Sequence, residues 1–182
     1  EAKIYVEPKG LASTFTSNTV SAAATGLGQM GQLQPTYSWI QQFSTKRTQT
    51  VTMRFEKDAV PDVTAEPIYE NIENPATDSQ KLGAVDPVGG LLSMILLPGA
   101  GPGDKACGES ITIFDGKRLY AFDMWSDGMK DVKRGAGGYA GPVLYCVASY
   151  RRIAGWGDKY MARKSDSKVE AYFAPIGKGE NG

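Results

Sequence analysis

Two short segments of alternating apolar and polar residues, Ile111–Phe114 and residues 117–122, constrain the fold more than any other feature of the sequence. Alternation with a period of two is typical of a strand that buries one face. The segments meet at Asp115-Gly116, a dipeptide that readily supplies the positive φ angles of a tight hairpin turn. The sequence therefore predicts a β-hairpin at the centre of the chain.

The only two cysteines, Cys107 and Cys146, lie on either side of this hairpin. They can tie it to a later strand-like run, residues 143–150, through a disulfide, or they can remain two buried thiols. Their spacing leaves both alternatives open. Neither belongs to a CxxC pair, which argues against a thioredoxin-like redox centre.

Further strand-like segments lie on both sides of the hairpin. The clearest is 48–56, in which Val51, Met53 and Phe55 alternate with polar residues. Three intervals are predicted to be turn or loop: 26–34, 127–138, and 58–80, the last with a short strand at Ile68-Tyr69. The remaining predicted strands are 3–6, 13–20, 36–44, 139–153 and 168–173.

One helix is predicted, over residues 86–97. Asp86 suits the N-cap, Pro87 the first turn, and Pro98-Gly99 the end of the helix. Because its apolar residues run almost all round, we expect it to be buried as a plug against the concave face of a sheet. It is too short to cross a membrane, which takes about 20 residues.

These elements predict one mainly β domain over residues 1–182, with a polar tail at 176–182. Strand after strand with a single apolar helix favours a curled antiparallel sheet, or a partly open β-barrel, packed on that helix.

Histidine is absent, which excludes Ser-His-Asp and Cys-His catalysis and any metal site built on imidazole. We expect no metal and no cofactor. The GxGxxG pattern at 26–31 lacks the βαβ context of a dinucleotide site, and 99–105 lacks the Gly-Lys-Ser/Thr ending of a phosphate loop. The 20 basic and 20 acidic residues cancel, so no nucleic-acid binding is expected.

Charged residues offer two weaker hypotheses. Paired carboxylates, Glu109 with Asp115 or Asp123 with Asp127, would suit acid-base hydrolysis, although turns and solvated strand faces explain them better. The later half of the chain is locally basic and would suit a phosphate-bearing lipid or an acidic partner; solvated strand edges are the favoured alternative. These basic residues are Lys130, Lys133, Arg134, Arg151, Arg152, Lys159, Arg163 and Lys164.

Aromatic residues recur along the predicted strands. Ordinary core packing is the favoured interpretation, but a curled sheet can also enclose an apolar ligand. The candidates for lining such a cavity are Trp39, Phe43, Tyr120, Phe122 and Tyr145, together with Trp125, Tyr150 and Trp156.

Three segments, DPVGGLLS at 86–93, FDGKRLY at 114–120 and YAGPVLYCVASYRRIAG at 139–155, resemble in sequence and order an alphaproteobacterial envelope family, domain of unknown function 3108. The resemblance implies export to the periplasm by a signal peptide, a Cys107–Cys146 disulfide, and a curled structure similar to periplasmic β-spiral proteins. It carries no catalytic residues. Members have further strands before the region matching Glu1 and after Pro175, so a barrel without them would be more open.

We therefore expect a non-enzymatic, monomeric periplasmic protein that binds an apolar ligand such as a lipid, or another envelope protein, through its curled sheet. The first alternative is a carboxylate-dependent hydrolase of envelope polymers, which a buried acidic pair in a cleft would favour. The second is a scaffold without ligand, its concave face filled by the helix.

Overall fold

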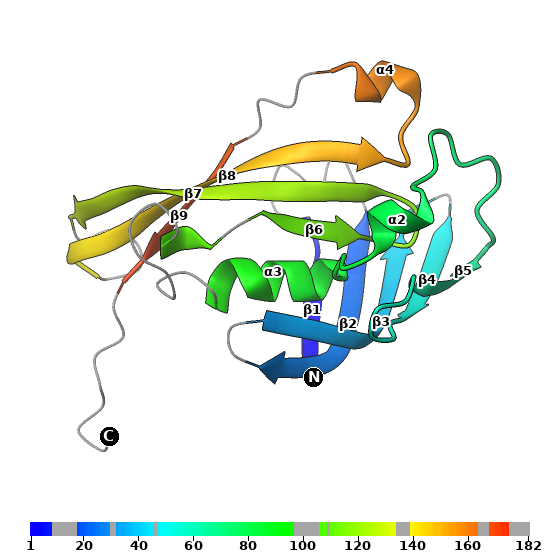
Figure 1. Cartoon of the computed structure of the whole chain (residues 1–182), viewed down its shortest axis with the longest axis horizontal. Coiled ribbons are helices and arrows are strands. Elements are labelled where there is room, and N and C mark those ends of the chain that lie inside the picture. The colour runs from blue at the N-terminus through cyan, green and yellow to red at the C-terminus, as the bar shows by residue number, and fades with distance from the viewer. Residues whose placement is uncertain are drawn as a thin grey trace.

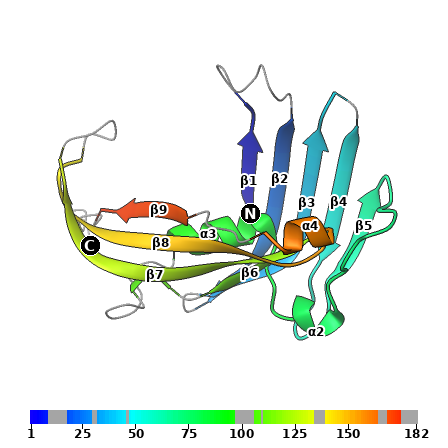
Figure 2. The ribbon, with the colours of Figure 1, turned by 90° about the horizontal axis from the view of Figure 1, so that it is seen from above.

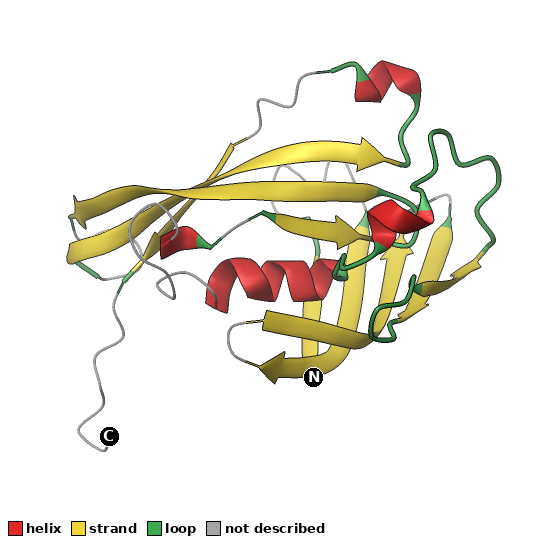
Figure 3. Ribbon diagram, viewed as in Figure 1, coloured by secondary structure: helices red, strands yellow, loops and turns green. Residues whose placement is uncertain are grey.

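The chain forms two antiparallel sheets joined by short helices (Figures 1 and 3). The computed structural model describes residues 1–8, 18–29, 32–45, 47–96, 106–108, 110–133, 139–163 and 168–174. Sheet A has five strands in sequence order: β1 (Ala2–Val6), β2 (Thr19–Gln29), β3 (Gln32–Phe43), β4 (Thr48–Arg54) and β5 (Asp62–Glu66). Sheet B has four: β6 (Ile111–Phe114), β7 (Leu119–Val132), β8 (Gly141–Ala154) and β9 (Lys168–Phe173).

The mainly β prediction is confirmed, and the described strands form no closed barrel. Seen from above, the strands of sheet A run across those of sheet B, and β7 and β8 form a long curved ribbon (Figure 2). The core between the sheets takes Val51 and Met53 from sheet A and Phe114, Leu119 and Ala154 from sheet B.

The inner face of sheet A follows from alternation along its strands. In β4, Gln49, Val51 and Met53 are buried while the residues between them are not, which confirms the predicted alternation at Val51 and Met53. Register places Ile40 of β3 beside Val51, and Ser38 beside Met53. These side chains share the face that is covered by sheet B.

The prediction of a turn over 26–34 is wrong, because β2 and β3 both continue through most of this interval. Register shifts between Thr25 and Gly26, and Gly26 pairs with Pro35. A Cβ at Gly26 would lie 2.4 Å from the carbonyl oxygen of Gln34, so the close approach of two backbones requires glycine here. The glycine pattern is part of a bulged hairpin and not a nucleotide loop.

Two other intervals predicted to be loops contain strands. The strand of 58–80 is β5 at Asp62–Glu66, and Ile68 lies outside it with an exposed side chain. In sheet B, β7 runs on to Val132 after a register shift between Ser126 and Met129. Of the predicted strand at 13–20, only Thr19 and Val20 are seen in a strand, because 13–17 fall outside the described residues.

The central hairpin is confirmed, with a four-residue turn. Phe114 pairs with Leu119, and the backbone N–H of Asp115 donates to the carbonyl of Arg118 at 3.1 Å. Gly116 has a φ of +90°, and a Cβ there would lie 2.5 Å from Cγ1 of Val51. The turn is therefore docked against sheet A where only glycine fits.

The disulfide between Cys107 and Cys146 is present, with an S–S distance of 1.99 Å and both residues buried. Cys146 pairs across β7 and β8 with Ser126. The disulfide thus fastens the segment before β6 to the middle of sheet B.

Helix α3 (Pro87–Leu96) contacts β6 of sheet B and β1, β2 and β3 of sheet A. Oδ1 of Asp86 accepts hydrogen bonds from the backbone N–H groups of Val88 (2.9 Å) and Gly89 (3.1 Å), which confirms the predicted N-cap. The prediction that this helix is buried all round is wrong, since Leu96 is 62% exposed and Leu91 and Ile95 are also exposed. No described helix is long and apolar enough to span a membrane.

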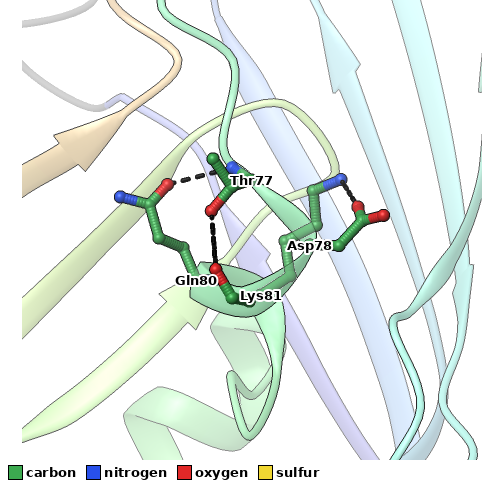
Figure 4. A network of polar contacts seen from close by, with 5 residues as sticks. Thr77, Asp78, Gln80 and Lys81 are labelled. Atoms are coloured by element: carbon green, nitrogen blue, oxygen red, sulfur yellow. Dashed lines mark hydrogen bonds and ion pairs between the residues drawn. The ribbon is translucent and has the colours of Figure 1, made fainter.

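Two four-residue helices were not predicted, α2 (Asp78–Lys81) and α4 (Asp158–Met161). A capping box starts α2, in which the backbone N–H of Gln80 donates to Oγ1 of Thr77. The N–H of Thr77 donates in turn to Oε1 of Gln80 (Figure 4). Lys81 adds an ion pair with Asp78 at 3.0 Å. Local hydrogen bonds, without any buried apolar stripe, thus define this helix.

Candidate functional site

A cleft of about 410 Å³ lies where the turn of the central hairpin meets the inner face of sheet A. We call it the inter-sheet cleft. One side is formed by β2, β3 and β4 and the turn between β3 and β4, and the other by the β6–β7 turn and by Tyr69. Its lining residues are Asn18, Val20, Ile40, Gln42, Phe43, Ser44, Arg47, Gln49, Val51, Tyr69, Asp115, Lys117 and Arg118.

The cleft has an apolar part supplied mainly by the inner face of sheet A. Ile40 and Val51 are neighbours in register, and both belong to the core. Phe43, at the end of β3, is 42% exposed, and Tyr69 is half-buried. This surface offers a hydrocarbon group an apolar contact next to solvent.

Polar amides surround the apolar part. Gln49 is buried, and its Nε2 donates to the carbonyl of Pro67 at 2.7 Å. Its Oε1 accepts from Nη2 of Arg47 at 2.5 Å, which positions the guanidinium beside the cleft.

Three cationic side chains reach the cleft from two turns. Arg47 comes from the β3–β4 turn, and Lys117 and Arg118 come from the β6–β7 turn. Nζ of Lys117 is 5.2 Å from the centroid of the Tyr69 ring, and the guanidinium carbon of Arg118 is 5.6 Å from the centroid of Trp156. Both contacts are in the range of cation–π attraction.

Among the described residues, Asp115 is the one carboxylate that lines the cleft. Its Oδ1 accepts hydrogen bonds from the backbone N–H groups of Lys117 (2.9 Å) and Arg118 (2.6 Å). Burial raises the pKa of Asp115, against these hydrogen bonds and the two nearby cations, which lower it. The main role of Asp115 is to shape the β6–β7 turn. The described lining of the cleft has three cationic side chains and one carboxylate.

The five predicted ligand-binding aromatics do not line one cavity. Phe43 alone lies in the inter-sheet cleft. Trp39 is on the opposite face of β3 from Ile40, paired with Thr52. Tyr145 is buried on β8, 5.0 Å from the ring of Tyr172.

Tyr120 and Phe122 belong to an aromatic cluster on sheet B. Phe122 pairs in register with Tyr150, and their ring centroids lie 5.6 Å apart. Trp156 completes the cluster, 6.2 Å from Tyr120 and 6.4 Å from Tyr150. The four half-buried rings cover each other. Packing on this face therefore explains these aromatic residues better than a ligand cavity does.

The predicted acidic pairs are engaged in structural contacts. Asp123 accepts from Ser110 at 2.6 Å and from Nε of Arg151 at 2.8 Å, and the Arg151 hydrogen bond lowers its pKa. Asp127 is exposed and pairs with Lys130 at 3.6 Å. Glu109, the proposed partner of Asp115, lies outside the described residues.

The predicted basic cluster is spread over separate contacts. Nη1 of Arg152 donates to the carbonyls of Tyr160 and Arg163, both at 3.3 Å. Arg134 and Lys164 fall outside the described residues, as does the glycine-rich segment 99–105. Lys130 and Arg151 are in the ion pairs just described.

The three cations of the cleft were missed from the sequence. A local signal exists, because basic residues occupy the turn of the predicted central hairpin and the short interval between the predicted strands 36–44 and 48–56. What was missing is the information that the turns meet, since Arg47 and Lys117 are far apart in the chain. Within the described part of the chain, no group of three or more Cys, Asp or Glu residues is arranged to hold a metal ion.

Comparison with known proteins gives no relative: no family model, curated protein or solved structure matches this chain. The resemblance to the envelope family stays a prediction.

Proposed function

We propose that this chain is a non-enzymatic protein of the bacterial cell envelope, located in the periplasm, that binds an apolar ligand in the inter-sheet cleft. The curled, β-spiral-like arrangement expected from the resemblance to the envelope family is part of the same proposal. The observation that carries it is the cleft itself. Its volume of about 410 Å³ falls within the range of about 300–1,000 Å³ typical of ligand pockets.

Two further observations support the proposal. A buried disulfide is typical of proteins that fold in oxidising compartments such as the periplasm. The chain has no histidine. Of the acidic residues considered for hydrolysis, Asp123 and Asp127 are paired with Arg151 and Lys130, and Oδ1 of Asp115 accepts from two backbone N–H groups of its own turn. These pairings favour binding over hydrolysis.

The test is a fluorescence titration of the full chain with the neutral apolar dye N-phenyl-1-naphthylamine. We expect saturable binding at one site per chain. Gln42→Trp places a large ring in the cleft, because Gln42 is exposed and lines it. This variant should weaken dye binding at least about ten-fold, since the ring occupies the volume the dye needs.

The matched control is Gln41→Trp, the neighbouring residue on the opposite face of β3, where it bonds to Thr50. It should leave dye binding unchanged. Equal binding by both variants would place the dye elsewhere. Failure of the unsubstituted protein to bind would favour the ligand-free scaffold.

A further inference from the structure

The positive groups of the inter-sheet cleft are arranged around its apolar part. Arg47 approaches from one turn, and Lys117 and Arg118 approach from the other. The turns belong to different sheets, so the three cations converge only because the β6–β7 turn is docked against Val51. Convergent cations at an apolar surface suit a ligand that has both an anionic and a hydrocarbon part.

The three cations are held by neutral neighbours. Arg47 bonds to the amide oxygen of Gln49, while Lys117 and Arg118 lie beside the rings of Tyr69 and Trp156. None of the three forms an ion pair with a described carboxylate. An anion would therefore gain charge-assisted hydrogen bonds without displacing an existing ion pair.

Asp115 does not cancel this charge. One carboxylate faces three cations, and its Oδ1 is committed to two backbone N–H groups of its own turn. The lining thus retains an excess of positive charge.

We infer that the ligand of the inter-sheet cleft is an anionic amphiphile whose phosphate or carboxylate is bound by Arg47, Lys117 and Arg118. Its hydrocarbon part lies on Val20, Ile40 and Val51. This inference rests on the proposed function and adds the chemical class of the ligand.

The experiment compares four probes by isothermal titration with the full chain: dodecyl phosphate, dodecanoate, dodecanol and inorganic phosphate. We expect both anionic amphiphiles to bind at least about ten-fold more tightly than dodecanol. Their affinity should fall as salt rises, because screening weakens an exposed charge interaction, whereas that of dodecanol should not. Inorganic phosphate should bind far more weakly than dodecyl phosphate, since it lacks the apolar contact.

Single variants locate the anion. Arg47→Gln, Lys117→Gln and Arg118→Gln should each weaken dodecyl phosphate binding about three- to ten-fold, and should weaken dodecanol binding by a clearly smaller factor. Lys159→Gln is the matched control, an equal loss of charge at an exposed position on α4 outside the cleft. Asp115→Asn should strengthen dodecyl phosphate binding a few-fold, because it removes the repelling carboxylate.

Trp156 supplies a second readout. A ligand that engages Arg118 alters the cation beside this ring, so dodecyl phosphate should change Trp156 emission in a Trp39→Phe, Trp125→Phe background. Arg118→Gln should abolish the change. Adsorption of the amphiphile elsewhere on the surface would not depend on Arg118.

The outcomes separate the two claims. Equal affinity for dodecyl phosphate and dodecanol, with no effect of the three variants, would overturn the anionic class while the apolar site stands. Inorganic phosphate binding as tightly as dodecyl phosphate would assign the cations to a free anion and overturn the amphiphile. Binding of no probe would overturn the proposed function itself.

Discussion

The central hairpin of sheet B is held in one way at its β6–β7 turn and in another way at the far end, where β7 extends beyond β6. At the turn, Gly116 is packed against Val51 and Val63 of sheet A, and Leu119 is buried in the shared core. Farther along β7, Trp125 and Met129 are exposed, and the disulfide fastens sheet B to the segment before β6. Packing between sheets positions the first end, and a covalent bond holds the second.

This difference between the packed turn and the crosslinked end separates the contacts that shape the cleft from the bond that stabilises the fold. Where the two sheets bury each other's side chains, packing determines the position of the β6–β7 turn. Because this turn forms one side of the inter-sheet cleft, packing also determines the shape of the cleft. Where β7 extends past the shared core, its own side chains Trp125 and Met129 stay exposed, and a crosslink that limits the unfolded chain adds to the stability of this end. We expect damage at the turn to affect ligand binding, and damage at the disulfide to affect stability alone.

The largest expected effect is that of removing the disulfide. Cys107→Ala with Cys146→Ala should lower the free energy of unfolding by about 4 kcal/mol, because the bond closes a loop in the unfolded chain. Urea denaturation measures this. Below the unfolding transition, dye binding in the cleft should match that of the unsubstituted protein, and no catalytic activity should appear.

Chemical reduction of the native protein is the control for this variant. It should give the same loss, since both treatments free the unfolded chain. Coincident unfolding curves with and without reductant would contradict the stabilising role.

Gly116→Ala should cost about 3 kcal/mol in unfolding free energy, the second largest effect. The positive φ accounts for about 1–2 kcal/mol, and the clash of the new Cβ with Val51 adds at least about 1 kcal/mol. Dye binding should also weaken, because the turn that carries Lys117 and Arg118 must shift.

Gly128→Ala isolates the conformational part of that cost. Gly128 has a φ of +86°, close to that of Gly116, but a Cβ there meets no atom within 4 Å. We expect a loss of about 1 kcal/mol with unchanged dye binding. Equal losses for the two glycines would show that docking against sheet A contributes nothing.

The smallest effect concerns two aspartates of the same hairpin whose pKa values shift in opposite directions. Burial raises the pKa of Asp115 above its ordinary 3.8, so its contribution to stability falls as pH rises from there through the raised value. The hydrogen bond from Arg151 lowers the pKa of Asp123 below 3.8. Its contribution is complete above 3.8 and is lost as pH falls through the lowered value.

Urea denaturation between about pH 3 and pH 7 tests both signs. Asp115→Asn keeps an oxygen acceptor for the turn, so it should gain stability relative to the unsubstituted protein as pH rises. Asp123→Asn should lose at most about 1 kcal/mol at neutral pH, as expected for an exposed ion pair, and nothing at the acid end. Parallel pH profiles for the two variants would refute the assigned shifts.

Local chemistry explains which elements could be predicted. The Asp-Gly turn, the alternation of Val51 and Met53 and the Asp86 N-cap each depend on neighbouring residues, and all three are confirmed. The register shift between β2 and β3 and the strand β5 were missed because partner strands define them. Gly26 is needed only where Gln34 approaches it, and Asp62–Glu66 is a strand because it pairs with β4.

The aromatic prediction shows the limit for the candidate site. Residue type alone placed Trp39 and Tyr145 beside Phe43, whereas strand register puts Trp39 on the outer face of sheet A and Tyr145 in sheet B. Equally, no sequence pattern brings Arg47 to Lys117 and Arg118.

The β class, the central hairpin and the capped helix could be predicted from the residues alone, and the absence of histidine excluded imidazole-based catalysis and metal sites. These follow from periodicity, turn propensity and side-chain inventory, which are properties of residues close in the chain. Where the two sheets meet, how far α3 is buried and which cations surround the cleft became known from the three-dimensional arrangement. Those features arise from contacts between distant segments, whose geometry is set by mutual packing and is not encoded in either segment alone.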